Sequence, residues 1–144
     1  MRQLPFAFLI MMAITGCQTN GDAAPTASSV ELSGPPAGAI AGDMASRLAE
    51  QVDPSRLPAI KMNEHQTEYA IALKAALQGW GYRFSADEKT EPDPASVDLH
   101  YSLDRMDEQI LAQLTMPSIS IARAYVANAN GATPASPLSI IQRK

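Results

Sequence analysis

The chain has 144 residues, of which 46% are hydrophobic and 6% aromatic, and its formal net charge at pH 7 is -4. This length suits one small domain and not comfortably two. An acidic chain without a basic cluster lacks the positive surface that binds phosphate backbones, so we expect no direct contact with nucleic acid.

The first 17 residues have the layout of a secretory signal. Arg2 precedes an apolar run over residues 4–14, which is roughly half of the ~20 residues that a membrane-spanning helix needs. The run ends in Ile14-Thr15-Gly16-Cys17, which resembles the bacterial lipobox. The resemblance implies a signal peptide over residues 1–16, cleaved between Gly16 and Cys17. It also implies a diacylglycerol on the Cys17 sulfur and an acyl chain on its new amine.

Cys17 is the only cysteine of the chain, so a disulfide within the chain is impossible. Lipidation explains its presence and its position, and several acyl chains together would anchor the protein stably in a membrane. The alternative is a buried thiol at the end of an N-terminal helix. Gln18 follows, whereas Asp at this place favours inner-membrane retention in the lipoproteins that the sequence resembles. We therefore expect the outer membrane, with the protein facing the periplasm.

Residues 17–38 are predicted to be the lipidated cysteine and a flexible tether. The segment is rich in small and polar residues, and Val30 and Leu32 are its only large apolar ones. Such a composition buries too little surface to offset the entropy of ordering the chain. The alternative is that residues 30–32 add a short strand to a sheet.

Folding is predicted to begin near Pro36 or Ala39 with an amphipathic helix that stops before Pro54. Its apolar stripe consists of Ile40, Met44, Leu48 and Val52, and Asp43, Arg47 and Glu50 are assigned to the outward side. Residues 57–62 are predicted to form a short strand.

A second helix is predicted to begin at Asn63, with Gln66 completing a capping box. It ends near Gly79 and Gly81, since glycine adopts the left-handed backbone that terminates helices. Its apolar face consists of Tyr69, Leu73, Ala76, Leu77 and Trp80. Trp80 is therefore expected mainly in the core, with an exposed anchor for a partner as the alternative.

The second half of the domain is predicted to be a β-meander. Strands are expected over residues 82–84, 97–104, 110–116 and 119–127, with an exposed loop over 85–96 and a turn over 105–108. In the last strand Arg123 and Tyr125 share a face with Ile119 and Ile121, which indicates an edge strand or one covered on both sides. The fold class is therefore α+β: one domain over residues 39–128, with two helices on an antiparallel sheet of about four strands.

Residues 129–144 are predicted to be a Pro/Ala-rich C-terminal tail outside this domain. Its large apolar residues, Leu138, Ile140 and Ile141, are isolated in a segment that is otherwise too polar and small to fold. Docking of this patch on the protein's own sheet and capture by another chain are both open. Together with Trp80, these residues are the candidate partner contacts.

No pattern in the sequence supports an enzyme. His65 and His100 lie on different predicted elements, and no ligand spacing for a metal is present. The acidic residues of the 85–96 loop lack the spacing of a calcium loop, and no serine lies in a nucleophile elbow. We therefore expect no catalytic residue, no metal, no cofactor and no small-molecule substrate.

Several segments together resemble the TrbH family of conjugal transfer lipoproteins. They are residues 15–19 (Thr-Gly-Cys-Gln-Thr), 39–44 with 46–51, 75–82, 123–125 and 131–139. The chain departs from the family over residues 64–68 and 85–96. The resemblance implies a component of the type IV secretion channel that plasmid operons encode for mating-pair formation. Its partners would be other channel proteins. It implies no catalytic residue.

Two other functions remain open. The segment 121–124 faintly resembles the arginine-bearing segment of peptidoglycan-binding OmpA-like domains, which place that arginine on a helix, whereas residues 118–121 are predicted to be strand. An aspartate to complete such a site is not evident. An inhibitory or exclusion lipoprotein of the outer membrane is the other possibility.

Overall fold

The computed structural model describes residues 30–62, 66–85 and 95–144. The predicted signal peptide, residues 17–29 of the predicted tether, the predicted cap Asn63, His65 and the acidic loop residues 86–94 lie outside this range. The elements are α1 (Gly34–Gln51), the 3-10 helix η1 (Pro54–Arg56), β1 (Ile60–Met62), α2 (Glu68–Gly79), β2 (Val97–Met106), β3 (Gln109–Thr115), β4 (Ile119–Asn128), β5 (Gly131–Pro134) and β6 (Ser139–Gln142).

Six strands form one sheet in the order β1-β2-β3-β4-β5, and β6 also pairs with β4. β1 runs parallel to β2, whereas the other pairs are antiparallel. The prediction of an α+β fold with two helices is confirmed. The expected antiparallel sheet of about four strands is wrong: the short strand predicted within residues 57–62 joins the sheet as the parallel strand β1, and β5 and β6 are added at the other end.

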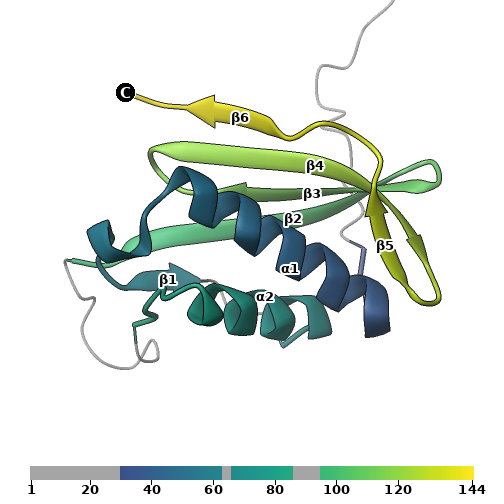
Figure 1. The fold of residues 1–144 in the computed structure, drawn as a ribbon, viewed down its shortest axis with the longest axis horizontal. Coiled ribbons are helices and arrows are strands. Elements are labelled where there is room, and N and C mark those ends of the chain that lie inside the picture. Colours follow the sequence, from purple (N-terminus) through teal and green to yellow (C-terminus); the bar gives the residue numbers. More distant parts are fainter. Residues whose placement is uncertain (1–29, 63–65, 86–94) are drawn as a thin grey trace, which may run out of the picture.

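Both helices lie on one face of the sheet, as Figure 1 shows. α1 packs against β3, β4 and β5, and α2 packs beside α1. The core between these layers is apolar and almost fully enclosed. Its largest side chains include Ile40, Met44 and Leu48 of α1, Tyr69, Leu73 and Leu77 of α2, and Leu99, Ile110, Leu114, Ile121 and Tyr125 of the sheet.

The first helix begins earlier than the sequence predicts. α1 starts at Gly34, and proline in its first turn supplies the backbone angle that a helix start requires. Upstream, Leu32 is 8% exposed and the Val30 N–H donates to the Leu103 carbonyl. Residues 30–38 are therefore part of the fold and not of a tether, although residues 30–32 do not form the alternative strand.

The second helix is capped by Thr67, whose hydroxyl accepts a hydrogen bond from the Ala70 N–H at 3.1 Å. Its predicted apolar face is confirmed at Tyr69, Leu73 and Leu77, all of which are buried. Trp80 is 51% exposed, so the prediction that it lies in the core is wrong.

The helix end explains the position of Trp80. Gly81 has a φ of 99° and turns the chain immediately after the tryptophan. Tyr82 returns to the interior instead, at 3% exposure, and its hydroxyl donates to the Val52 carbonyl. The predicted strand over residues 82–84 is reduced to one bridge between Phe84 and Ile60.

The C-terminal segment is the largest departure from the predicted domain limits. β3 occupies one edge of β4, and the other edge pairs with β6 along residues 119–122 and with β5 along residues 125–128. Residues 131–134 and 139–142 thus extend the sheet, because they satisfy backbone groups that β4 would otherwise expose. The prediction of a separate tail over residues 129–144 is wrong, and β4 is an interior strand.

Candidate functional site

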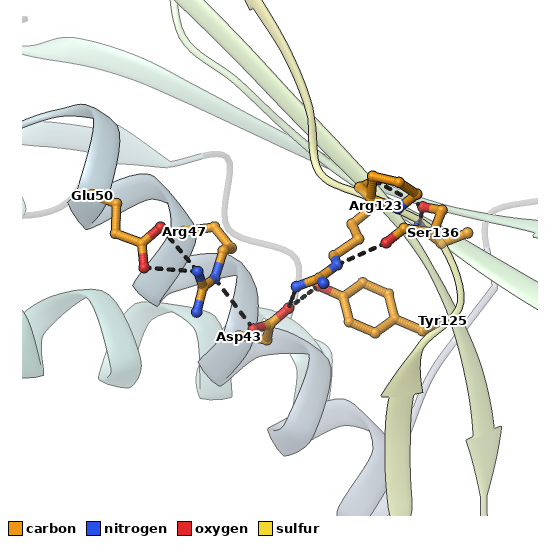
Figure 2. Close-up of polar contacts among 8 residues, drawn as sticks. Asp43, Arg47, Glu50, Arg123, Tyr125 and Ser136 are labelled. Atoms are coloured by element: carbon orange, nitrogen blue, oxygen red, sulfur yellow. Dashed lines mark hydrogen bonds and ion pairs between the residues drawn. The ribbon is translucent and has the colours of Figure 1, made fainter.

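A polar cluster joins α1 to β4 (Figure 2). Asp43 Oδ2 accepts hydrogen bonds from Arg123 Nη1 at 2.9 Å and from the Tyr125 hydroxyl at 2.7 Å. The side chains of Asp43 and Arg123 are only 24% and 21% exposed. This ion pair connects residues 80 positions apart in the chain, so it fixes α1 on the sheet.

The other oxygen of Asp43 faces a second arginine. Arg47 Nε lies 3.5 Å from Asp43 Oδ1, and Arg47 Nη1 lies 2.7 Å from Glu50 Oε1. The sequence prediction placed all three residues on the outward side of the helix. For Asp43 this is wrong, because a residue at the border of the apolar stripe can turn toward a cation on the sheet.

Arg123 also holds the connection between β5 and β6. Its Nε donates to the Ser136 carbonyl at 3.0 Å. The Ser136 hydroxyl in turn accepts from the Ala124 N–H at 2.9 Å and donates to the Pro137 carbonyl. One arginine therefore links the first helix, the central strand and the C-terminal segment.

The pKa of the Tyr125 hydroxyl is strongly shifted. Burial raises this pKa far above its ordinary value, and the hydrogen bond to Asp43 adds to the increase. Tyr125 is thus a neutral donor, and both carboxylate oxygens of Asp43 are engaged. Such a carboxylate stabilises the fold and is poorly placed to accept a proton from a substrate.

A second surface lies at the outer side of β6, which we call the β6 edge (Ser139–Gln142). Ile140 is 41% exposed and Ile141 is 56% exposed. Leu138, by contrast, packs against the core. Two of the three predicted apolar contacts of this segment are thus available at the surface, and the third helps to dock the segment.

The structure does not bring all predicted contact residues together. Trp80 follows α2, which lies across α1 from β6 in Figure 1. The two surfaces are therefore separate. Gly16 and Cys17, the predicted cleavage and lipidation residues, lie outside the described residues.

A shallow depression of about 540 Å³ is lined by the end of α1, by η1 and by Ser118. Within residues 30–62, 66–85 and 95–144, no group of three His, Cys, Asp or Glu side chains is placed to hold a metal ion. No helix in the same ranges is long and apolar enough to cross a membrane.

The Asp43–Arg123 pair was missed at the level of sequence. One indication was present, since Arg123 lies on the apolar face of its strand beside Ile121 and Tyr125. A lone arginine in such a position requires a counter-charge, but its spacing along the chain does not identify Asp43. Arg123 is on a strand and is bound to Asp43 and Ser136, which disfavours the peptidoglycan-binding alternative.

Comparison with known proteins identifies the family. The family model described as "Conjugal transfer protein TrbH" matches residues 18–144. A protein of Sinorhizobium fredii (strain NBRC 101917 / NGR234), named "Probable conjugal transfer protein TrbH", is 50% identical over 147 residues, which cover 99% of each chain. No solved structure matches. The chain therefore belongs to the TrbH family of conjugal transfer proteins.

Proposed function

We propose that this protein is a lipid-anchored, non-enzymatic component of a conjugal transfer apparatus, held at the outer membrane and facing the periplasm. Family membership supports the role in conjugal transfer, since the family match extends over residues 18–144. This region begins directly after Cys17, which would be the first residue of the mature protein if the lipobox-like segment is cleaved after Gly16. The folded domain would then work in the periplasm beside other proteins of the mating-pair formation system.

The arrangement of charged groups supports a structural task. In the cluster around Asp43, hydrogen bonds from Arg123 to Asp43 and Ser136 and from Tyr125 to Asp43 connect α1, β4 and the C-terminal segment. Among the exposed apolar residues, Ile140 and Ile141 lie on a short outer strand and Trp80 lies at a helix end, where they are accessible to a protein partner. Binding of other transfer proteins is the activity that these surfaces fit best.

The anchor is tested with two neighbouring variants in donor cells. Cys17→Ser removes the only thiol, so we expect loss of labelling by a palmitate analogue, accumulation of precursor and a conjugation frequency near that of a gene deletion. Gln18→Asp is the matched control, because it retains the cysteine. It should preserve labelling and shift the protein to the inner-membrane fraction. Unchanged labelling of the Cys17→Ser protein would contradict the anchor.

The partner class is tested separately by crosslinking intact envelopes and purifying the protein. Recovery of conjugal transfer proteins is expected. Recovery of peptidoglycan alone would replace the proposal by the peptidoglycan-binding alternative. Recovery of a single surface protein that loses activity when it is bound would replace it by the inhibitory or exclusion alternative. A variant that is lipidated normally but no longer supports mating would show that the anchor and the assembly role are separable.

A further inference from the structure

The backbone of β6 presents an unfilled hydrogen-bonding edge. The Arg143 N–H donates to the Ser118 carbonyl, and the register continues through Ile141 opposite Ser120 and Ser139 opposite Ala122. In an antiparallel ladder alternate residues bond to the same neighbour. The N–H and C=O groups of Ile140 and Gln142 therefore point away from β4. Within the described ranges, no backbone partner for these groups is seen.

The side chains of this edge favour pairing with another strand. All four residues of β6 are exposed, and neither proline nor a charged residue interrupts them. Isoleucine has a high preference for strands, and exposed apolar edges of this kind tend to add a further strand. Charged residues on an edge strand, or a twist of that strand, usually prevent such pairing. Here the first charged residue is Arg143, which lies beyond β6.

We propose that the β6 edge pairs with the β6 edge of a second copy of this protein, antiparallel and about a two-fold axis at Ile141. This register places Ile140 opposite Gln142 of the second copy, and the reverse. Because both residues point their N–H and C=O groups outward, each Ile140–Gln142 pair can exchange two backbone hydrogen bonds. Only residues of β6 take part. The sheets of the two copies become one continuous sheet.

The positions of the isoleucines agree with this register. Ile141 is paired with Ser120, so it lies on the helix-free face of the sheet, and its counterpart in the second copy would be directly opposite. Residues opposite each other in a non-hydrogen-bonded pair have Cα atoms about 4.5 Å apart. The two Ile141 side chains would cover each other at the axis, where each is now 56% exposed.

The charges also permit the pairing. With the axis at Ile141, Arg143 lies opposite Ser139 of the second copy. The two Arg143 positions are then four residues apart along the ladder, or about 14 Å at ~3.4 Å per residue. This separation exceeds the Debye length of about 8 Å at physiological ionic strength. Repulsion between the basic ends is therefore screened, whereas a parallel arrangement would place them side by side.

The register is tested by disulfide formation in the full chain, expressed in envelopes and treated with a mild oxidant. Ile141→Cys should give a reducible dimer, because the expected Cα separation lies within the range of a disulfide. Gln142→Cys and Val126→Cys are the matched controls. Both positions are exposed, but neither would face its own copy across the axis. The unmodified chain controls for Cys17.

A second variant tests the backbone pairing. Ile140→Pro in the Ile141→Cys chain removes only an outward N–H, so the dimer should be lost while β6 stays docked and the thermal midpoint changes little. Absence of the Ile141→Cys dimer would overturn the proposal. So would equal crosslinking of all three cysteine variants, which would indicate random collision or bonding to Cys17. A dimer that persists with Ile140→Pro would overturn the strand pairing.

Discussion

The two faces of the central sheet differ in what covers them. On the helix-covered face, Leu103, Ala112 and Ile121 are at most 5% exposed. The two helices lie on this side of the sheet (Figure 1). The opposite face carries small and polar residues on the same strands. Its rows run across β2, β3 and β4 as His100–Thr115–Ser120, Ser102–Gln113–Ala122 and Asp104–Leu111–Ala124.

The helix-free face has an order of its own. The Gln113 amide donates to the Ser120 hydroxyl at 3.1 Å, and the Thr115 and Ser120 hydroxyls lie 2.9 Å apart. Ser120 is only 3% exposed. Apolar burial thus stabilises one face of the sheet, whereas the polar side chains of the other face form hydrogen bonds with one another. Substitutions on the two faces should therefore have unequal costs.

The largest difference is expected between two leucines of β3. Leu114 is 1% exposed on the helix-covered face, so Leu114→Ala should lower the free energy of unfolding by about 2–5 kcal/mol. Leu111 is half-buried on the helix-free face, so Leu111→Ala should cost only about 1 kcal/mol. Urea denaturation of the two variants measures both values. Equal costs would show that something also covers the helix-free face.

A smaller effect is expected at the only ion pair that crosses from the helix layer to the sheet among the described residues. Asp43→Asn and Arg123→Met should each lower the free energy of unfolding by roughly 1.5–3 kcal/mol, since each leaves a charged partner partly buried. The double variant should cost less than the sum, because the two residues share one interaction.

Glu50→Gln provides the control for the comparison of the two single variants with the double variant. The Arg47–Glu50 pair is more exposed, with side-chain exposures of 34% and 49%, so its loss should cost at most about 1 kcal/mol. Chemical denaturation of the four variants decides the matter. Additive costs for Asp43 and Arg123 would mean that their contact contributes little beyond packing.

The smallest effect is expected at Tyr82 and depends on pH. Burial raises the pKa of Tyr82 from 10.0 to about 12, and the nearby Asp53 carboxylate adds to the shift. Below pH 10 the hydroxyl is neutral in both the folded and the unfolded chain. Between pH 10 and 12 the unfolded chain releases a proton that the folded chain retains, so stability falls as pH rises.

Tyr82→Phe isolates this contribution. At neutral pH it should cost about 1 kcal/mol, through loss of the hydrogen bond to the Val52 carbonyl. Tyr69 and Tyr125 have pKa values that are raised as well, and they affect both proteins equally. The stability gap between the two proteins should therefore narrow above pH 10. A gap that is independent of pH would show that Tyr82 does not retain its proton in the folded state.

The sequence by itself determined the elements with a regular local pattern. The alternation of Leu99, Tyr101 and Leu103 predicted β2, and the alternation of Ile110, Ala112 and Leu114 predicted β3. The spacing of Ile40, Met44 and Leu48 likewise predicted α1. Such patterns are visible in sequence because period and burial are set by neighbours a few residues away.

Only the tertiary structure decided the pairings between distant segments. The C-terminal residues appeared too poor in apolar side chains to fold, yet they form β5 and β6 because β4 offers them a free edge. Arg123 on an apolar strand face called for a counter-charge, but only the packing of α1 on β4 identifies Asp43 as its partly buried partner. Trp80 continued the apolar stripe in sequence, but the turn at Gly81 gave the interior position to Tyr82. Arg123 lies 80 positions from Asp43, and the Tyr82 hydroxyl bonds to Val52 30 positions before it, so local periodicity carries no information about these contacts.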